Sequence, residues 1–184
     1  MMATSKEKKW LQEGKQSKIT KEIKAIAKKF TGNEFEKVRS IFLWINKNIK
    51  NAPKNQNTIK IFAKRSASKI IKDGWHTGCH DIAVIFVTLA RASNIPTKYI
   101  EGIDKINPHN RGHCVAEVYI SKSWMLADAT KNSLYFLPTR SSFYQQNYIL
   151  GIGLDSWDVG IKSFKDWKEH SQRVKRAVKR IQKT

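Results

Sequence analysis

The spacing of apolar residues predicts helices along the first fifty positions. Lysines alternate with apolar residues three or four positions apart at Ile19, Ile23, Ile26, Ala27 and Phe30, the period of a helix with one buried face. Gly32 is expected to end that helix, and a short frayed helix over 6–13 precedes it. A longer helix begins near Asn33 or Glu34, and we expect it to pack on the core through Phe35, Val38, Ile41, Phe42, Ile45 and Ile49.

A nearly continuous apolar run from Gly78 to Arg91 predicts a buried helix that begins at Cys79. Its end is predicted near Asn94, because asparagine tolerates the left-handed conformation that often closes a helix and Pro96 prevents continuation. Before it, a polar loop over 51–57 leads to a short helix over 67–72, with Ser66 as its N-cap and a stop at 73–74.

The second half of the chain alternates apolar and polar residues, which predicts strands over 97–103, 113–120 and 123–130. Residues 121–122 form the expected turn between the last two. If Ile120 pairs with Ser123, then Asp128 lies on the same face as His113, one diagonal step away and within hydrogen-bond reach. Further strands are predicted over 134–137 and 148–152, and a terminal helix over 163–183. The fold class is therefore α+β, with an antiparallel sheet.

The length of 184 residues fits one domain with a real core. Hydrophobic residues make up 40% and charged residues 27%, which are values of globular proteins. No segment is apolar enough to predict a transmembrane span or a signal peptide, so a cytoplasmic location is expected. Only two cysteines are present, which argues against a disulfide scaffold and suits a free thiol in a reducing compartment.

The net charge of +20 attracts anionic surfaces such as nucleic acid, acidic lipid or acidic cell-wall polymers. Most of this charge is lysine spread along the whole chain, which specifies no partner, and only the segment from Lys162 to Lys179 concentrates it. A non-catalytic basic module that binds an anionic polymer is therefore the alternative function. A third possibility combines catalysis and binding: an enzyme whose positive charge brings it to an acidic polymeric substrate. The oligomeric state cannot be deduced from these patterns.

Three residues have the chemistry of a cysteine hydrolase. Cys79 stands at a predicted helix N-terminus, where backbone N–H groups and the helix dipole favour a thiolate. His113 is the expected base and acid, and Asp128 the residue that orients its ring. The backbone N–H of Cys79 is the first candidate for an oxyanion donor, with Trp75 or the neighbouring His80 as tentative second donors.

Other readings of the same residues remain. A cysteine at the head of a buried helix is often only a small core residue, and His113 or Asp128 taken singly could be structural. Nitrogen and sulfur ligands for a metal could come from His76, Cys79, His80, His109, His113 and Cys114. Neighbours along a strand point to opposite faces, however, and zinc would consume the residues that the triad needs, so no metal and no cofactor are predicted. Cys114 is expected to pack inward, opposite to His113.

Several ordered motifs together resemble the transglutaminase-like superfamily. They are Gly78-Cys79-His80-Asp81-Ile82-Ala83, the segment 89–96, His113 with Glu117-Val118-Tyr119, and Trp124 with Asp128-Ala129-Thr130, preceded by the helix 38–49. The resemblance covers roughly residues 35–130. It implies a papain-like core, a Cys-His-Asp triad of Cys79, His113 and Asp128, and acyl transfer on amides, as in cysteine proteases, other hydrolases and transferases.

The chain departs from the family pattern at two places. Members usually follow the catalytic histidine with Ala-Trp, where this chain has Cys114-Val115, and they have a glycine where Asn94 stands. The loss of a large indole beside His113 is expected to reshape the wall of the cleft. Asp81 matches the family's acidic position and is interpreted as structural.

A segment beyond the core, Asp155-Ser156-Trp157-Asp158, resembles one seen in some prokaryotic members. We expect this segment either to close one side of the cleft as a strand and turn, or to contact substrate through Trp157. The predicted organisation is a helical extension over 1–32, a catalytic core over 33–160 and a basic helix over 161–184. The predicted function is a cysteine hydrolase or acyltransferase acting on a protein or peptide amide, with hydrolysis favoured over crosslinking in so small a domain.

Overall fold

The computed structural model describes residues 5–106 and 112–181. Its helices are α1 (Ser5–Lys8), α2 (Lys21–Ala27), α3 (Glu34–Asn48), α4 (Thr58–Ile61), α5 (Ala67–Asp73), α6 (Cys79–Ala92), α7 (Ser142–Gln146) and α8 (Phe164–Ile181), with 3-10 turns at 9–11 and 138–140. Its strands are β1 (Lys50–Asn51), β2 (Trp75–His76), β3 (Thr97–Asp104), β4 (Gly112–Ile120), β5 (Ser123–Asp128), β6 (Ser133–Tyr135) and β7 (Asn147–Gly153). The α+β prediction is confirmed.

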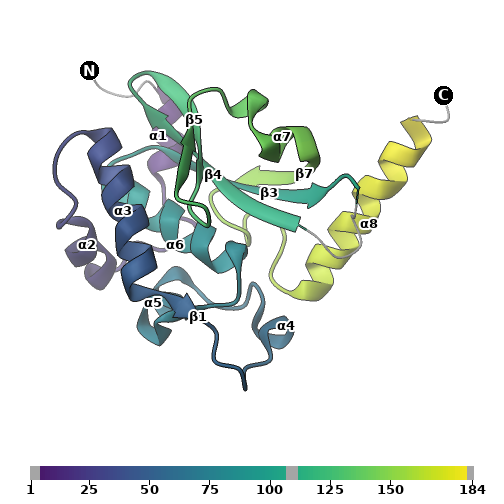
Figure 1. Cartoon of the computed structure of the whole chain (residues 1–184), viewed down its shortest axis with the longest axis horizontal. Coiled ribbons are helices and arrows are strands. Elements are labelled where there is room, and N and C mark those ends of the chain that lie inside the picture. Colours follow the sequence, from purple (N-terminus) through teal and green to yellow (C-terminus); the bar gives the residue numbers. More distant parts are fainter. Residues whose placement is uncertain (1–4, 107–111, 182–184) are drawn as a thin grey trace.

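Five strands form one antiparallel sheet in the order β6-β5-β4-β3-β7, and β1 and β2 form a small parallel pair. Figure 1 shows α6 on one side of the sheet with α3 outside it, and α7 on the other side. Side-chain alternation along β4 separates the two faces: Cys114, Ala116 and Val118 pack towards α6, whereas Val115 packs with Phe143 of α7.

Helix α6 is buried on all sides, because α2, α3 and α5 cover the surface that the sheet does not. Every residue from His80 to Arg91 is buried. This position explains why the apolar run in the sequence is continuous and lacks the one-sided pattern of a surface helix. The main core also includes Ile23 and Ala27 of α2, so this early helix contributes to the same packing as α6.

Local signals in the sequence set most of the element boundaries. Asn33 and Glu36 form a capping box at the start of α3. Gly74 (φ 72°) and Asn94 (φ 65°) take the left-handed conformation that ends α5 and follows α6. Ser121 and Lys122 also have positive φ, which makes the two-residue turn that pairs Ile120 with Ser123.

The C-terminal helix α8 returns to the sheet through its first turns. Trp167 is buried and stacks on Phe164, and its indole ring fills the space beside Gly112 at the start of β4. A Cβ on Gly112 would lie 2.7 Å from the Trp167 ring, so this close approach requires glycine. Within the described ranges, no helix has the length and apolar character to cross a membrane.

Candidate active site

Cys79 is the first residue of α6 and is half-buried. Gly78 precedes it with φ 145° and ψ −161°, and no side chain caps the helix. The first backbone N–H groups of α6 are therefore not occupied by a capping side chain, and the positive end of the helix dipole lies at the sulfur. This is the arrangement that favours a thiolate and leaves donors for a developing oxyanion.

The backbone conformation at Gly78 can be tested by substitution. Its φ lies in a region that only glycine adopts readily, yet a Cβ there would meet no atom within 4 Å. Gly78→Ala is therefore expected to destabilise the protein through backbone strain alone, by about 1–3 kcal/mol, and to displace the nucleophile. Urea unfolding measures the loss, and an unchanged midpoint together with unchanged Cys79 alkylation would contradict the strain.

His113 and Asp128 meet across the β4–β5 pair as the predicted register requires. Ala116 pairs with Ala127, which sets Asp128 on the same face as His113. The His113 Nε2 atom lies 2.8 Å from Asp128 Oδ2. Asp128 Oδ1 accepts backbone N–H groups of Thr130 (3.1 Å) and Lys131 (3.3 Å), so the carboxylate is fixed from the opposite side. The imidazole therefore keeps Nδ1 for the sulfur.

The sulfur of Cys79 is surrounded by groups that favour its ionised form. The neighbouring Cys114 side chain has the largest influence and lowers its pKa, burial acts in the opposite direction, and the hydrogen bond and charge of His113 lower it further. Together these groups hold the pKa of Cys79 well below its ordinary value. These influences favour the thiolate form of Cys79.

The imidazole of His113 is held in its charged form. Burial lowers its pKa, but hydrogen bonds and charges of Asp128 and Cys79 outweigh burial and raise the pKa to about 9. For Asp128 burial raises the pKa, but the hydrogen bond and charge of His113 outweigh burial and lower it below the ordinary value. The three shifts favour an anionic Cys79, a cationic His113 and an anionic Asp128.

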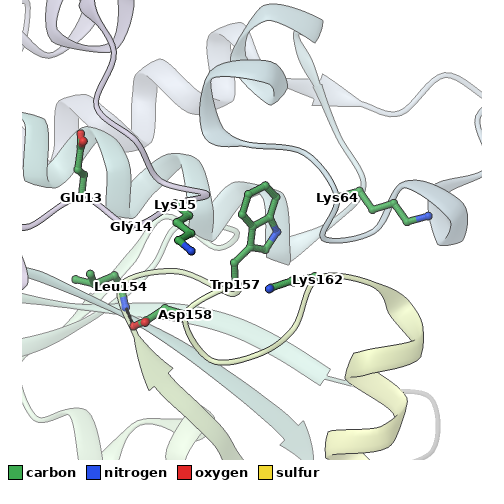
Figure 2. A pocket seen from close by; sticks show the side chains of 8 residues that line it. All are labelled: Glu13, Gly14, Lys15, Lys64, Leu154, Trp157, Asp158 and Lys162. Carbon is green, nitrogen blue, oxygen red and sulfur yellow. Dashed lines mark hydrogen bonds between the residues drawn. The ribbon is translucent and has the colours of Figure 1, made fainter.

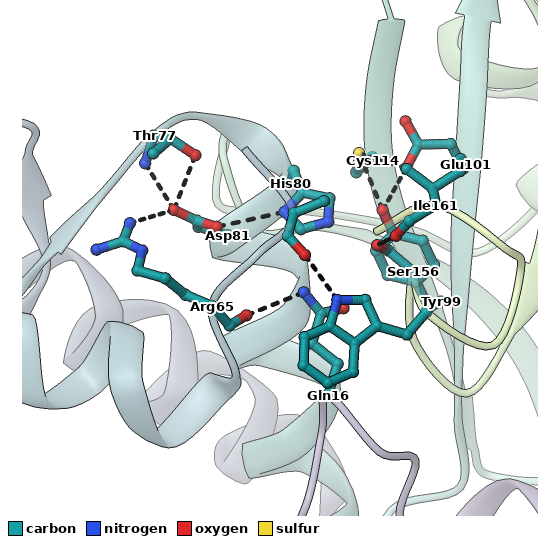
Figure 3. A network of polar contacts seen from close by, with 12 residues as sticks. Gln16, Arg65, Thr77, His80, Asp81, Tyr99, Glu101, Cys114, Ser156 and Ile161 are labelled. Atoms are coloured by element: carbon teal, nitrogen blue, oxygen red, sulfur yellow. Dashed lines mark hydrogen bonds and ion pairs between the residues drawn. The ribbon is translucent and has the colours of Figure 1, made fainter. Parts of the chain in front are cut away.

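Asp81 holds the turn before the nucleophile in place (Figure 3). Its Oδ2 accepts Arg65 Nη2 (2.5 Å), Thr77 N (2.7 Å) and Thr77 Oγ1 (2.9 Å). Burial raises its pKa, but hydrogen bonds and charge from His80, with contributions from Thr77 and Arg65, lower it to about 2. Asp81 is 1% exposed, so it contacts no substrate and acts through the turn it fixes.

The three tentative site residues, Trp75, His80 and Trp157, have different surroundings in the structure. Trp75 on β2 is half-buried, with the Arg65 guanidinium 3.9 Å from its ring centre. His80 is 1% exposed, and its Nδ1 lies 3.3 Å from Asp81 Oδ1. Trp157 donates its indole N–H to the Ala63 carbonyl and lines a separate pocket (Figure 2), which none of Cys79, His113 and Asp128 lines.

The alternative of a metal site requires a cluster of ligand side chains. Across 5–106 and 112–181, no three His, Cys, Asp or Glu side chains gather in a way that could hold an ion. His109, one of the possible ligands, lies outside the described residues.

Cys114 and its neighbours were not predicted as part of the site. Strand alternation correctly predicts that Cys114 packs inward, and it is 3% exposed. What the pattern does not reveal is that Cys114 lies near enough to Cys79 of α6 to lower its pKa. The replacement of the family's usual Ala-Trp by Cys114-Val115 is the sequence signal that could have indicated it.

Comparisons with known proteins identify the family and the fold. A family model described as the transglutaminase-like superfamily matches residues 22–129, more than half of the chain. A proposed cysteine protease from Cytophaga hutchinsonii aligns with a TM-score of 0.63 and 23% identity over 85% of this chain and 50% of its own. This chain thus spans half the length of that structure.

Two further solved structures are more distant. LapG from Legionella pneumophila has a TM-score of 0.49 and 15% identity, with 83% of this chain and 95% of its own covered. A proposed protease from Parabacteroides distasonis has a TM-score of 0.45 and 15% identity over 72% of this chain and 30% of its own. Among curated proteins, no sequence matches this chain.

Proposed function

The chain belongs to the transglutaminase-like superfamily, and from this membership we propose that it is a cysteine hydrolase or acyltransferase acting on peptide or other amide bonds. The observation that carries the proposal is His113, which joins the Asp128 carboxylate at 2.8 Å and interacts with the Cys79 sulfur at the start of α6. A histidine used only for packing would not need a buried carboxylate on one side and an ionised sulfur on the other.

In the proposed reaction the Cys79 thiolate attacks the carbonyl carbon of an amide. Negative charge moves to the carbonyl oxygen, which the Cys79 backbone N–H at the uncapped end of α6 stabilises. The imidazolium of His113 gives its proton to the departing amine, and the C–N bond breaks to leave a thioester. Water or an amine, deprotonated by His113, then attacks the thioester and returns the thiolate. Asp128 stabilises the imidazolium throughout. Trp75 remains a proposed second oxyanion donor.

Water is the acceptor that we propose over an amine, so that the protein acts as a hydrolase on a protein or peptide substrate. A cytoplasmic location is proposed as well, because both cysteines are free thiols and a reducing compartment preserves them.

Intact-mass spectrometry against a library of peptides and peptidoglycan fragments tests this proposal. We expect cleaved products from at least one amide class and an acyl adduct that maps to Cys79, whereas Cys79→Ala gives neither. Cys114 is an internal control, since the same digest reports whether the second thiol reacts. A library that yields no cleavage and no adduct on folded protein would contradict the proposal.

The pH dependence of cleavage follows from the two pKa shifts. Activity needs an ionised Cys79 and a protonated His113. The depressed pKa of Cys79 places the acid limb below the range of an ordinary thiol, and the His113 pKa of about 9 places the alkaline decline near pH 9. We expect a bell-shaped rate profile with a plateau at neutral pH. A rate that rises steadily through pH 8 to 9 would show instead a thiol that titrates normally.

A further inference from the structure

A cavity of about 650 Å³ lies outside the group formed by Cys79, His113 and Asp128, and no step of the proposed reaction uses it. Its volume is within the range of small-molecule sites, roughly 300–1,000 Å³. Three segments far apart in the chain build its walls: 13–15, residue 64 and 154–162 (Figure 2).

Buried hydrogen bonds hold these walls at a fixed separation. Asp155 is fully buried, and its Oδ2 accepts Gln16 N (3.0 Å), Ser17 N (3.0 Å) and Ser17 Oγ (2.8 Å). A Cβ on Gly14 would lie 2.0 Å from the same carboxylate oxygen, so the two segments could not approach this closely with another residue there. The pocket is therefore formed before any ligand arrives.

The acidic side chains at the pocket are already engaged. Glu13 accepts the backbone N–H of Ile19 at 2.8 Å, and Asp158 accepts that of Leu154 at 2.8 Å. These bonds leave both carboxylates negatively charged, but Lys15, Lys64 and Lys162 outnumber them in the lining, so the pocket keeps a net positive charge.

The remaining lining combines an aromatic ring with cations. Trp157 donates its N–H to the Ala63 carbonyl at 2.6 Å, so its ring offers only apolar surface to a ligand. Lys15 and Lys162 line the same pocket, and Figure 2 shows them on either side of Trp157. A flat apolar surface between two ammonium groups suits a flat ring that carries an anionic group.

We propose that this pocket binds a small organic anion, with a planar apolar ring on Trp157 and a carboxylate or phosphate between Lys15 and Lys162. The site is independent of the chemistry at Cys79. A carboxylate and a phosphate would both bind through their negative charge, so the proposal covers either group.

Calorimetric titration of the full chain tests the site with 1-naphthoate, 1-naphthyl phosphate and uncharged 1-naphthamide as probes. We expect at least one anion to bind at least about tenfold more tightly than the amide, and the double variant K15Q/K162Q to weaken that anion by about tenfold. K28Q/K29Q makes the same change in net charge at two exposed positions directly after α2, and is expected to leave binding unchanged. Equal weakening by both double variants, or no binding of either anion, would overturn the proposal.

Discussion

His113→Ala is expected to lower amide cleavage on the order of 10⁴-fold. The substitution removes the acid that protonates the leaving amine and the cation that stabilises the Cys79 thiolate, so two steps fail together. The pKa of Cys79 should rise in the same variant, because the hydrogen bond and charge of His113 both lower it. Steady-state kinetics on a substrate from the peptide library measures the first effect, and the pH dependence of alkylation the second.

His170 provides a matched control for that substitution. It lies on α8, where its Nδ1 atom is 3.1 Å from the backbone oxygen of Asp166, and it belongs to neither proposed site. His170→Ala should leave the rate within about twofold, because an isolated substitution of this kind changes stability little. A His113→Ala protein that is folded and as active as His170→Ala would refute the assigned role.

Asp81→Ala is expected to destabilise the protein by about 3–5 kcal/mol, because it leaves the buried guanidinium of Arg65 without its closest partner. Asp81 also receives both donors of Thr77 two residues before Cys79, so the nucleophile turn should loosen. Asp73→Ala is the control. Asp73 bonds the same guanidinium at 3.0 Å but is 15% exposed, and its loss leaves Arg65 paired with Asp81, so about 1 kcal/mol or less is expected.

Acid denaturation should reveal the contribution of Asp81 to stability. The folded pKa of Asp81 is lowered from 3.8 to about 2, so its contribution to stability is present above pH 4 and is lost as the pH falls towards 2. The shift corresponds to about 2 kcal/mol. Urea unfolding at pH 6 and pH 2.5 measures it, and a pH effect in Asp81→Ala as large as in the unmodified protein would exclude this origin.

Residues with strong local preferences allowed much of the fold to be predicted. Asn33, Gly74 and Asn94 mark helix ends through their own backbone and side-chain chemistry, and the 121–122 turn fixes the β4–β5 register. The short elements α4, α7, β1 and β2 were not predicted. They are two to five residues long, so no periodic pattern develops within them, and tertiary contacts decide their conformation.

The site divides in the same way. The meeting of His113 and Asp128 follows from strand register, which the sequence specifies through alternation and the turn. The proximity of Cys114 to Cys79 joins a strand to a helix, and the pocket at Trp157 joins three distant segments. Such contacts depend on how elements pack against one another, and a single sequence contains no local signal for that packing.

The rate of Cys79 alkylation by iodoacetamide, followed from pH 4 to 10, tests most directly whether this sulfur rests as an anion. We expect a rate that is already at its plateau at neutral pH, with a midpoint well below the ordinary thiol value of about 8.5. A midpoint at or above that value in the folded protein, or labelling no faster than in a denatured control, would contradict it.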